Sequence, residues 1–312
     1  MEALVGKMQN ILNNIERVII GKREAAELML MALICKGHVL IEDVPGVGKT
    51  SMAAALAKSV DCSFKRIQFT PDIMPSDVTG FSVYNPKTGG FDYKPGPIMS
   101  HFILADEINR TSPKTQSSLL EVMEENQVTV DGVTYKTPTP FMVLATQNPV
   151  EYLGTYPLPE AQLDRFFMKI TIGYPGKEEE SKMLSRFRQA NPMEALTPVV
   201  SHNDVLELQS SSESIYVHDD IADYIVSLVR LTRSREDLVS LGASPRGSIS
   251  LYKGAQAWAM YNNRDYVIPE DVQKMAPYIL RHRIMLKQEA KLKKITALDI
   301  IQQSLDRLST GI

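Results

Sequence analysis

The sequence predicts an α/β fold, with five parallel strands and covering helices, followed by a smaller all-helical domain. Short apolar runs alternate with helical segments, and strands buried on both faces of a parallel sheet are apolar throughout. The last such run, residues 166–172, precedes Pro175-Gly176, and only helical patterns follow. We therefore expect an α/β domain at residues 1–175 and an all-α domain at residues 176–312.

The composition is that of a soluble globular protein. Of the 312 residues 44% are hydrophobic and 23% are charged, and the net charge of −3 gives no general attraction to nucleic acid or membrane. Two isolated cysteines, Cys35 and Cys62, and five histidines without metal-ligand spacing indicate neither a zinc site nor a disulfide framework. The start lacks a signal-peptide core and no apolar run reaches about 18 residues, so we expect a cytoplasmic protein without direct membrane insertion.

Helical periodicity covers residues 2–18, where Leu4, Met8, Ile11 and Ile15 share one face, and a second helix is expected at about 23–35. Residues 38–51, His-Val-Leu-Ile-Glu-Asp-Val-Pro-Gly-Val-Gly-Lys-Thr-Ser, then combine a buried strand and a glycine turn, and Lys49-Thr50 opens a helical run from Met52 to Val60. Such glycine turns let backbone N–H groups converge on phosphate oxygens, and the helix N-terminus adds positive partial charge.

This stretch predicts a site for a nucleoside triphosphate. The expected phosphate-binding residues are Pro45, Gly46, Val47, Gly48, Lys49, Thr50 and Ser51. Lys49 would reach the β- and γ-phosphates, and the Thr50 hydroxyl would ligate Mg²⁺. Asp43 stands where the pattern G-x-x-x-x-G-K-[ST] has its first glycine, at the strand end, so we expect the phosphate cradle to be intact.

Ile19, Ile20 and Gly21 interrupt the two N-terminal helices. Two interpretations are evenly supported by the pattern. The residues either continue the core-facing surface of the helices or form an apolar slot for the base of the nucleotide.

The segment after the glycine loop predicts a strand and an exposed hairpin. Residues 64–69 alternate as a strand does, and Thr70-Pro71-Asp72 is expected to cap a short helix through Ile73 and Met74. Residues 80–97 combine turn signals with five aromatic or apolar side chains, which predicts a projecting β-hairpin. Exposed aromatic hairpins more often contact a partner than serve as ordinary surface turns.

A second chemical motif lies at residues 101–107, where an apolar strand ends in two acids. Asp106 would lie beside the Mg²⁺ shell, and Glu107 would orient and polarise the attacking water. Two acids at the end of a buried strand are costly unless a cation or water meets them. Together with Lys49 and Thr50, they predict triphosphate hydrolysis.

Helix 113–126 leads to a second hairpin at 127–135 with an Asp-Gly turn, and then to a buried strand at 141–146. Asn148 follows this strand, where its amide can contact the γ-phosphate or the lytic water, although an asparagine before proline is also an ordinary turn residue. Arg165 precedes the fifth strand and, taken alone, fits a solvated helix-end charge.

The C-terminal part predicts helices at about 177–190, 203–211, 219–233, 246–262 and 269–281. Ser244-Pro245-Arg246 forms a helix start, and an arginine there hints at a local anion, because it opposes the helix dipole. The basic residues of the run 281–294 favour a solvated helix face over a nucleic-acid site.

Taken together, these motifs resemble those of the AAA+ ATPases, and their residues are similar to those of the MoxR branch. The similar stretches are Glu42 to Thr50, Leu104 to Arg110, Ala145 to Pro149, Leu158 to Phe166 and Gly242 to Arg246. The resemblance covers about residues 15–285 and implies a P-loop AAA+ core with a five-stranded parallel sheet and an all-α lid. Members of this branch often carry an aspartate at the position of Asp43.

The resemblance also implies roles for individual residues. Asn148 corresponds to sensor 1, Arg165 to the arginine finger that reaches a neighbouring subunit's site, and Arg246 to sensor 2 on the lid. The hairpin at 80–97 corresponds to the helix-2 insert and that at 127–137 to the pre-sensor-1 hairpin. The pattern further implies a hexameric ring that binds ATP and Mg²⁺. Such proteins are regarded as chaperone-like remodellers of a protein client, often with a von Willebrand factor A domain partner in complex assembly or metal and cofactor insertion.

Two other functions stay open at this point. One is an ATP-gated scaffold with little turnover, which slow hydrolysis with intact ring assembly would favour. The other is a DNA-dependent motor, but the acidic balance and the sparse hairpin lysines, Lys87, Lys94 and Lys136, argue against nucleic acid.

Overall fold

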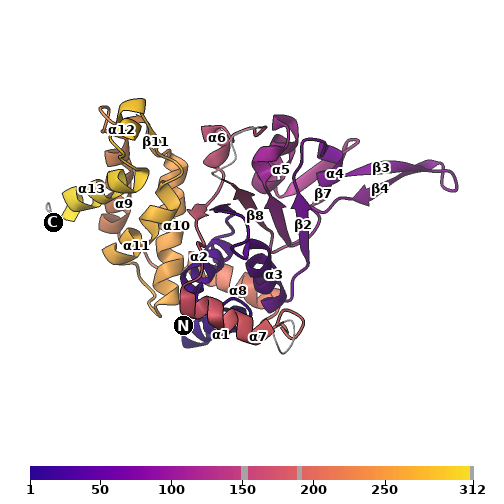
Figure 1. Ribbon diagram of the computed structural model, residues 1–312, viewed down its shortest axis with the longest axis horizontal. Coiled ribbons are helices and arrows are strands. Elements are labelled where there is room, and N and C mark those ends of the chain that lie inside the picture. Colours follow the sequence, from indigo (N-terminus) through magenta and orange to yellow (C-terminus); the bar gives the residue numbers. More distant parts are fainter. Residues whose placement is uncertain (149–153, 188–191, 310–312) are drawn as a thin grey trace.

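A five-stranded parallel sheet forms the centre of the computed structural model, and the C-terminal helices stand at one end of the molecule (Figure 1). The structure describes residues 1–148, 154–187 and 192–309. The sheet has the five strands that the sequence predicts, in the order β2-β5-β8-β1-β9. These strands span Phe64–Gln68, Phe102–Asp106, Met142–Gln147, Val39–Glu42 and Met168–Ile170, in that order.

Alternate residues of the strands face two separate cores, because successive side chains of a strand point to opposite faces. Val39 and Ile41 pack in the core that contains the N-terminal helices, whereas Leu40 packs in the core on the other face. The first face carries α1 (Glu2–Glu16), α2 (Arg23–Ile34) and α3 (Lys49–Ser59). The second face carries α4 (Pro75–Thr79), the single turn η1 (Ile108–Arg110) and α5 (Pro113–Glu125).

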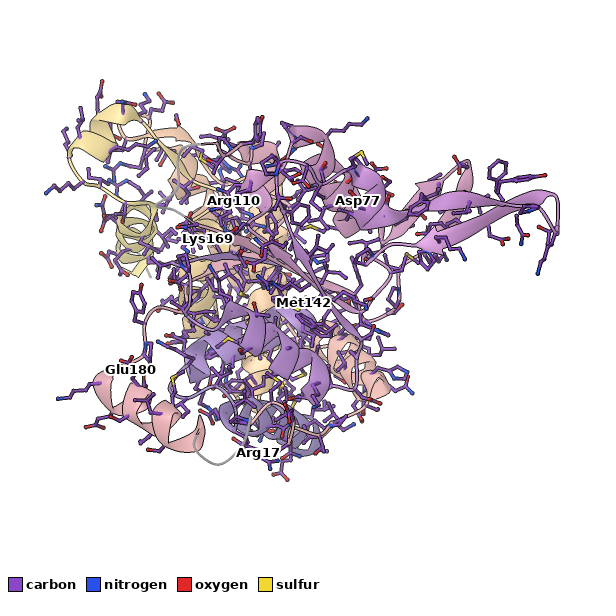
Figure 2. All side chains as sticks on the ribbon, turned by 45° about the vertical axis from the view of Figure 1, so that its right-hand side comes forward. Arg17, Asp77, Arg110, Met142, Lys169 and Glu180 are labelled. Atoms are coloured by element: carbon purple, nitrogen blue, oxygen red, sulfur yellow. The ribbon has the colours of Figure 1, made fainter. Side chains whose placement is uncertain are left out.

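Both predicted hairpins are present. Strands β3 (Gly80–Asn85) and β4 (Gly90–Pro95) form the one that projects far from the body, and β6 (Gln127–Val130) pairs with β7 (Val133–Lys136) (Figures 1 and 2). Phe91 on the projecting hairpin is 73% exposed. Phe81 and Tyr84 are exposed as well, so these three aromatic side chains are available for contact, whereas Tyr93 stacks on Tyr135 of the second hairpin.

Most of the chain beyond residue 175 is helical, and one small two-stranded antiparallel sheet accompanies the helices. After the short α6 (Glu160–Leu163), the helices are α7 (Lys177–Phe187), α8 (His202–Glu213), α9 (Asp219–Arg233), α10 (Pro245–Tyr261), α11 (Pro269–Leu280), α12 (Gln288–Leu292) and α13 (Ala297–Ser309). Strands β10 (Val239–Leu241) and β11 (Met285–Leu286) form this two-stranded sheet. Of the expected helix at 177–190, residues 188–190 lie outside the described ranges.

Two local expectations are corrected. The short helix expected through Ile73 and Met74 begins instead at Pro75, because Asp77 accepts a hydrogen bond from the Met74 N–H (2.9 Å) and so fixes the helix start there. Arg283, expected on a solvated face, is only 4% exposed, and its contacts are described below.

Among the described residues, no helix has both the length and the apolar character needed to cross a bilayer.

Candidate active site

The phosphate-binding loop joins the carboxyl end of β1 to α3, as the motif predicts. Gly48 caps α3 with a left-handed backbone (φ 88°), and no side chain caps the first turn. The N–H groups of a helix's first turn have no acceptors within the helix, so they are available to an anion. The Lys49 ammonium donates to the carbonyl oxygen of Asp43 at 3.0 Å, which folds the lysine over the loop.

Asp43 ties this loop to the end of the sheet. Its carboxylate is 8% exposed and accepts hydrogen bonds from three backbone N–H groups, those of Val44 (2.9 Å), Ile172 (2.7 Å) and Gly173 (2.6 Å). A glycine could make none of these contacts. The departure from the glycine pattern therefore fixes the loop to the segment that leaves β9.

The two acids predicted to act on water and metal lie at the carboxyl end of β5. Asp106 accepts from the Thr146 hydroxyl at 2.6 Å and from the Arg66 guanidinium at 2.6 and 3.1 Å. An ionised carboxylate offers about four lone-pair positions, so the contacts with Thr146 and Arg66 leave room for Mg²⁺, which binds one or two carboxylates together with substrate phosphates. Thr50 and Asp106 thus fit a magnesium site, and among the described residues no group of three or more acidic, histidine or cysteine side chains forms another metal site.

Glu107 has an unusual backbone and two side-chain partners. Its φ of 58° is left-handed, which costs a non-glycine residue about 1 kcal/mol and turns the chain sharply after the strand. Its N–H donates to Thr146 (2.8 Å), and its carboxylate accepts from Gln68 (2.8 Å) and pairs with Arg110 (3.3 Å). The carboxylate is held at the edge of the sheet, beside Asp106 and near the loop.

Asn148 follows β8 and is 7% exposed. Since β8 lies between β5 and β1, the carboxyl ends of three neighbouring strands bring together Lys49 with Thr50, Asp106 with Glu107, and Asn148. These are the residues that the sequence assigns to triphosphate chemistry.

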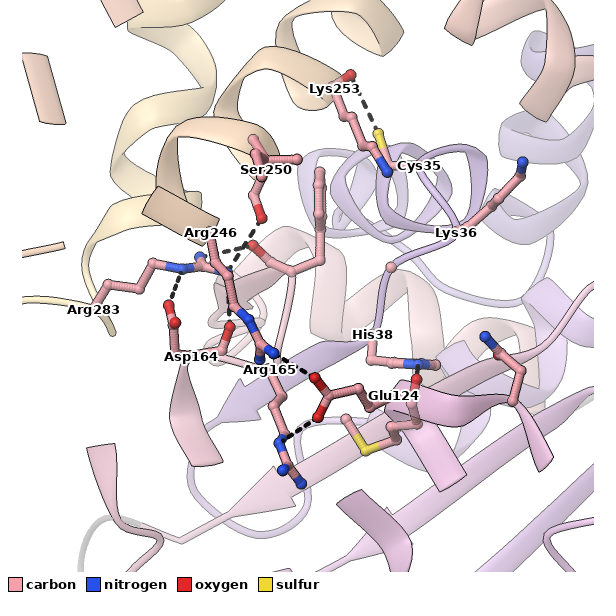
Figure 3. A pocket seen from close by; sticks show the side chains of 15 residues that line it. Cys35, Lys36, His38, Glu124, Asp164, Arg165, Arg246, Ser250, Lys253 and Arg283 are labelled. Carbon is pink, nitrogen blue, oxygen red and sulfur yellow. Dashed lines mark hydrogen bonds and ion pairs between the residues drawn. The ribbon is translucent and has the colours of Figure 1, made fainter. Parts of the chain in front are cut away.

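Arg165 and Arg246 form a separate cluster, which Figure 3 shows from close by. Both guanidinium groups bind the carboxylate of Glu124 at the end of α5, Arg165 through Nε at 3.1 Å. They line a pocket of about 360 Å³ that also contains His38 and Asp164. Arg246 is 52% exposed at its side chain, so it stays accessible from outside.

This cluster lies at the amino edge of the sheet, opposite the phosphate-binding loop. Arg165 precedes β9, and His38 precedes β1, with its carbonyl accepting from the N–H of Phe167 at 2.8 Å. Strand β1 separates the two edges by four residues, about 13 Å at the usual rise per residue. The two predicted arginines are thus brought together with each other and not with the loop.

Asp164 and Arg283 join the C-terminal helices to the sheet. Arg283 donates to Asp164 Oδ1 (2.9 Å) and to the carbonyl oxygens of Phe166 (2.7 Å) and Phe167 (3.1 Å). Asp164 also accepts from the Ser244 hydroxyl at 2.8 Å, at the start of α10. Burial lowers the pKa of Arg283 to about 10, so the guanidinium is charged at neutral pH.

The buried side chain of His38 connects three elements at the same amino edge of the sheet. Its Nδ1 accepts from the Val143 N–H (3.0 Å), so Nε2 carries the hydrogen and donates to the Met123 carbonyl (2.9 Å). Burial lowers the pKa of His38 to about 4 and keeps the ring neutral. Met123 precedes Glu124, so this ring links β1, β8 and the end of α5 that holds the arginines.

Ile19, Ile20 and Gly21 lie between α1 and α2. Ile19 packs against the core, and a side chain at Gly21 would collide with the carboxylate of Glu179, whose Oε1 lies 1.8 Å from the position of a Cβ atom. Both interpretations of this stretch stay open, because a residue can pack on the core and still border a base.

Sequence reasoning missed five residues that shape the site: Arg66, Gln68, Glu124, Asp164 and Arg283. Adjacency to Arg165 is a signal that could have found Asp164. The other four belong to no recognised motif.

Comparisons with known proteins agree with this architecture. The model of the "ATPase family associated with various cellular activities (AAA)" matches residues 38–168, and that of the "AAA lid domain" matches residues 232–304. The chain is 55% identical to Uncharacterized protein YeaC of Bacillus subtilis, covering 100% of this chain and 96% of the relative. It is 42% identical to Chaperone MoxR1 of Mycobacterium tuberculosis, covering 99% and 84% of the two chains.

A crystal structure of a candidate ATPase from Cytophaga hutchinsonii has the same fold, with a TM-score of 0.92 and 42% identity over 98% of this chain and 95% of that one. Motif order, sheet topology and relatives agree: the chain belongs to the MoxR family of AAA+ ATPases.

Proposed function

We propose that the chain hydrolyses ATP at a site shared by two copies in a ring, and uses the cycle to remodel a protein client. The observation that carries this proposal is the position of Arg165 and Arg246. Both are at the amino edge of the sheet, whereas the loop, both acids and Asn148 are at the carboxyl edge. Guanidinium groups so placed cannot serve the phosphates of their own chain, but an adjacent copy can present them to the loop.

In this proposal the loop from Pro45 to Ser51 cradles the triphosphate, and Lys49 neutralises its β- and γ-phosphates. Thr50 and Asp106 would hold Mg²⁺, which supplies positive charge to the phosphate oxygens. Ile19, Ile20 and Gly21 would border the base.

Glu107 and Asn148 would orient a water molecule toward the γ-phosphorus. As the new phosphorus–oxygen bond forms, the bond to the β,γ-bridging oxygen breaks, so ADP leaves and the water proton passes to Glu107. Arg165 and Arg246 of the adjacent copy would stabilise the charge that develops, an effect worth about 10³-fold or more for comparable arginines.

Coupling to a client would run through the lid and the hairpins. Arg246 lies at the start of α10, so loss of the phosphate that it contacts in the adjacent copy would release the lid from that copy, while the bond from Ser244 to Asp164 would keep the start of α10 attached to its own sheet. The projecting hairpin, with Phe81, Tyr84 and Phe91 exposed, would contact the client. We extend the proposal to a cytoplasmic hexamer, in which each chain divides between residues 175 and 176 into an α/β domain and an all-α domain. The hexamer would work with a von Willebrand factor A domain partner in complex assembly or metal and cofactor insertion.

The test is ATP hydrolysis per subunit as a function of protein concentration, for the wild type and for Arg165→Ala. We expect the specific rate of the wild type to rise with concentration, and that of the variant to fall at least 100-fold while ATP still binds. Arg230→Ala is the matched control, because Arg230 is exposed at the end of α9. A rate independent of concentration and of Arg165 would contradict a shared site.

A further inference from the structure

Among the described residues, helix α7 turns almost all of its side chains to solvent. Every side chain described in it, residues 177–185, is exposed except that of Glu179. Figure 2 shows this helix, which carries Glu180, at the outside of the molecule. A helix of 11 residues is marginal in water without tertiary packing, so a surface that covers α7 would stabilise it.

The exposed side chains of α7 are apolar near its middle and acidic in its first turn, so they are complementary to an apolar surface with a basic residue at its edge. Met183 and Leu184 are 37% and 68% exposed, and the first turn carries Glu178, Glu179 and Glu180. Of these three carboxylates only that of Glu179 has a hydrogen bond among the described contacts, to the N–H of Gly176.

The lid carries a groove with this character. It has a volume of about 470 Å³ and lies between α9 and α10, where Val226 and Ile249 are 46% and 58% exposed. Lys253 stands at its edge, and the ammonium group has no ion pair or hydrogen bond among the described residues. Glu213 also lines the groove, but its carboxylate is already paired with Lys36 at 2.7 Å. The apolar floor therefore matches the leucine of α7, and the ammonium group of Lys253 matches its carboxylates.

The groove is continuous with the cluster of arginines. Arg246, Ile249 and Lys253 follow each other on α10 at intervals of three and four residues, and so share one face of the helix. Ile249 and Lys253 also line the pocket that holds Arg165. Whatever approaches Arg246 therefore meets the groove as well.

Helix α7, in turn, is attached beside the phosphate-binding loop. The segment before it is held by Asp43, which accepts from the N–H groups of Ile172 and Gly173, and by Lys22, which donates to the Tyr174 carbonyl at 2.7 Å. A copy that presents Arg165 and Arg246 to this loop brings its groove toward α7.

We propose that the groove binds α7 of a second copy of this chain, with Met183 and Leu184 against Val226 and Ile249 and the acidic first turn near Lys253. This inference rests on the proposed function, because the shared site is what brings the two faces together. It identifies a contact that would hold the copies in register, apart from the arginines themselves.

The experiment measures self-association by sedimentation equilibrium with a non-hydrolysable ATP analogue. Leu184→Asp and Ile249→Asp each place a carboxylate in the apolar contact, so each should raise the dissociation constant at least tenfold. Leu292→Asp is the matched control, because Leu292 is 80% exposed on α12, away from the groove, and should associate as the wild type does. Circular dichroism melting checks that all variants fold.

An equimolar mixture of Leu184→Asp and Ile249→Asp gives the decisive result. One variant keeps an intact groove and the other an intact α7, so the mixture should form a 1:1 dimer at concentrations where each variant alone stays monomeric. Wild-type association of Leu184→Asp, or a mixture of folded variants that stays monomeric, would overturn the proposal.

These results are distinguishable from a failure of the shared site. If the mixture dimerises but Arg165→Ala hydrolyses ATP at the wild-type rate, the docking holds and the proposed catalytic role of Arg165 fails. If Arg165→Ala is inactive and Leu184→Asp associates normally, the docking alone is wrong.

Discussion

The junction between sheet and lid should depend on Arg283 more than on any surface charge near it. Its guanidinium is buried and donates to the Asp164 carboxylate, to the Ser250 hydroxyl and to four main-chain carbonyls, those of Asp164, Phe166, Phe167 and Ile279. Replacement by methionine keeps much of the volume but leaves a largely buried carboxylate and several carbonyls without their donor.

The expected cost follows from these contacts. Breaking a buried ion pair by removing one partner typically costs about 3–5 kcal/mol, and we expect Arg283→Met to lie in this range. Arg283→Lys keeps the charge but offers three donors in place of five, so some carbonyls stay unpaired, and we expect about 2–3 kcal/mol.

Urea unfolding followed by circular dichroism and by tryptophan fluorescence measures both values, and agreement of the two probes checks that unfolding is two-state. Arg230→Lys, an exposed change on α9, should stay within about 0.5 kcal/mol of the wild type. A double-mutant cycle with Asp164→Asn should give a coupling of about 1 kcal/mol or more. Stability of Arg283→Met within 0.5 kcal/mol of the wild type would refute the assigned role of this junction.

Three further predictions follow from the two edges of the sheet. Glu107→Gln should lower ATP hydrolysis by about 10²-fold or more while a fluorescent ATP analogue still binds, and intact hydrolysis would show that another group activates the water. Gly48→Ala should weaken binding of that analogue at least tenfold, because alanine strains a backbone at φ 88° and puts a methyl group into the cradle; unchanged affinity would contradict the assigned phosphate site. His38, with its folded pKa lowered from 6.5 to about 4, takes up a proton on unfolding, so stability is lost as the pH falls below about 6.5 toward 4. Its share between pH 7 and pH 5 is about 2 kcal/mol at 1.36 kcal/mol per pKa unit, and urea midpoints of His38→Gln should show a correspondingly flatter pH dependence; equal slopes would refute this.

Most of the fold and of the candidate active site could be predicted from motifs that are contiguous in the sequence. The strand, loop and helix from Val39 to Ser59, the Asp106-Glu107 strand end and Asn148 each combine a fold signal with chemistry inside a few residues. Parallel strands then place such segments at one edge, so their proximity follows from the fold class. The resemblance to the MoxR family is confirmed by the relatives and by the fold.

Contacts between distant segments could not be predicted in the same way. Glu124, Arg165 and Arg246 meet from three elements, and no local pattern links them. Arg283 belongs to a run of basic residues whose lysines, Lys287, Lys291, Lys293 and Lys294, are exposed as expected, so composition gave no sign that this arginine turns inward to Asp164.

The most direct test of the shared site mixes two inactive variants. Lys49→Ala should lose ATP binding but keep Arg165, and Arg165→Ala should keep ATP binding but lack the arginine. If the site is completed by an adjacent copy, an equimolar mixture should regain hydrolysis, since an Arg165→Ala loop can face an intact arginine of a Lys49→Ala subunit. A mixture as inactive as its components, under conditions where the two variants associate, would contradict a site built from two copies.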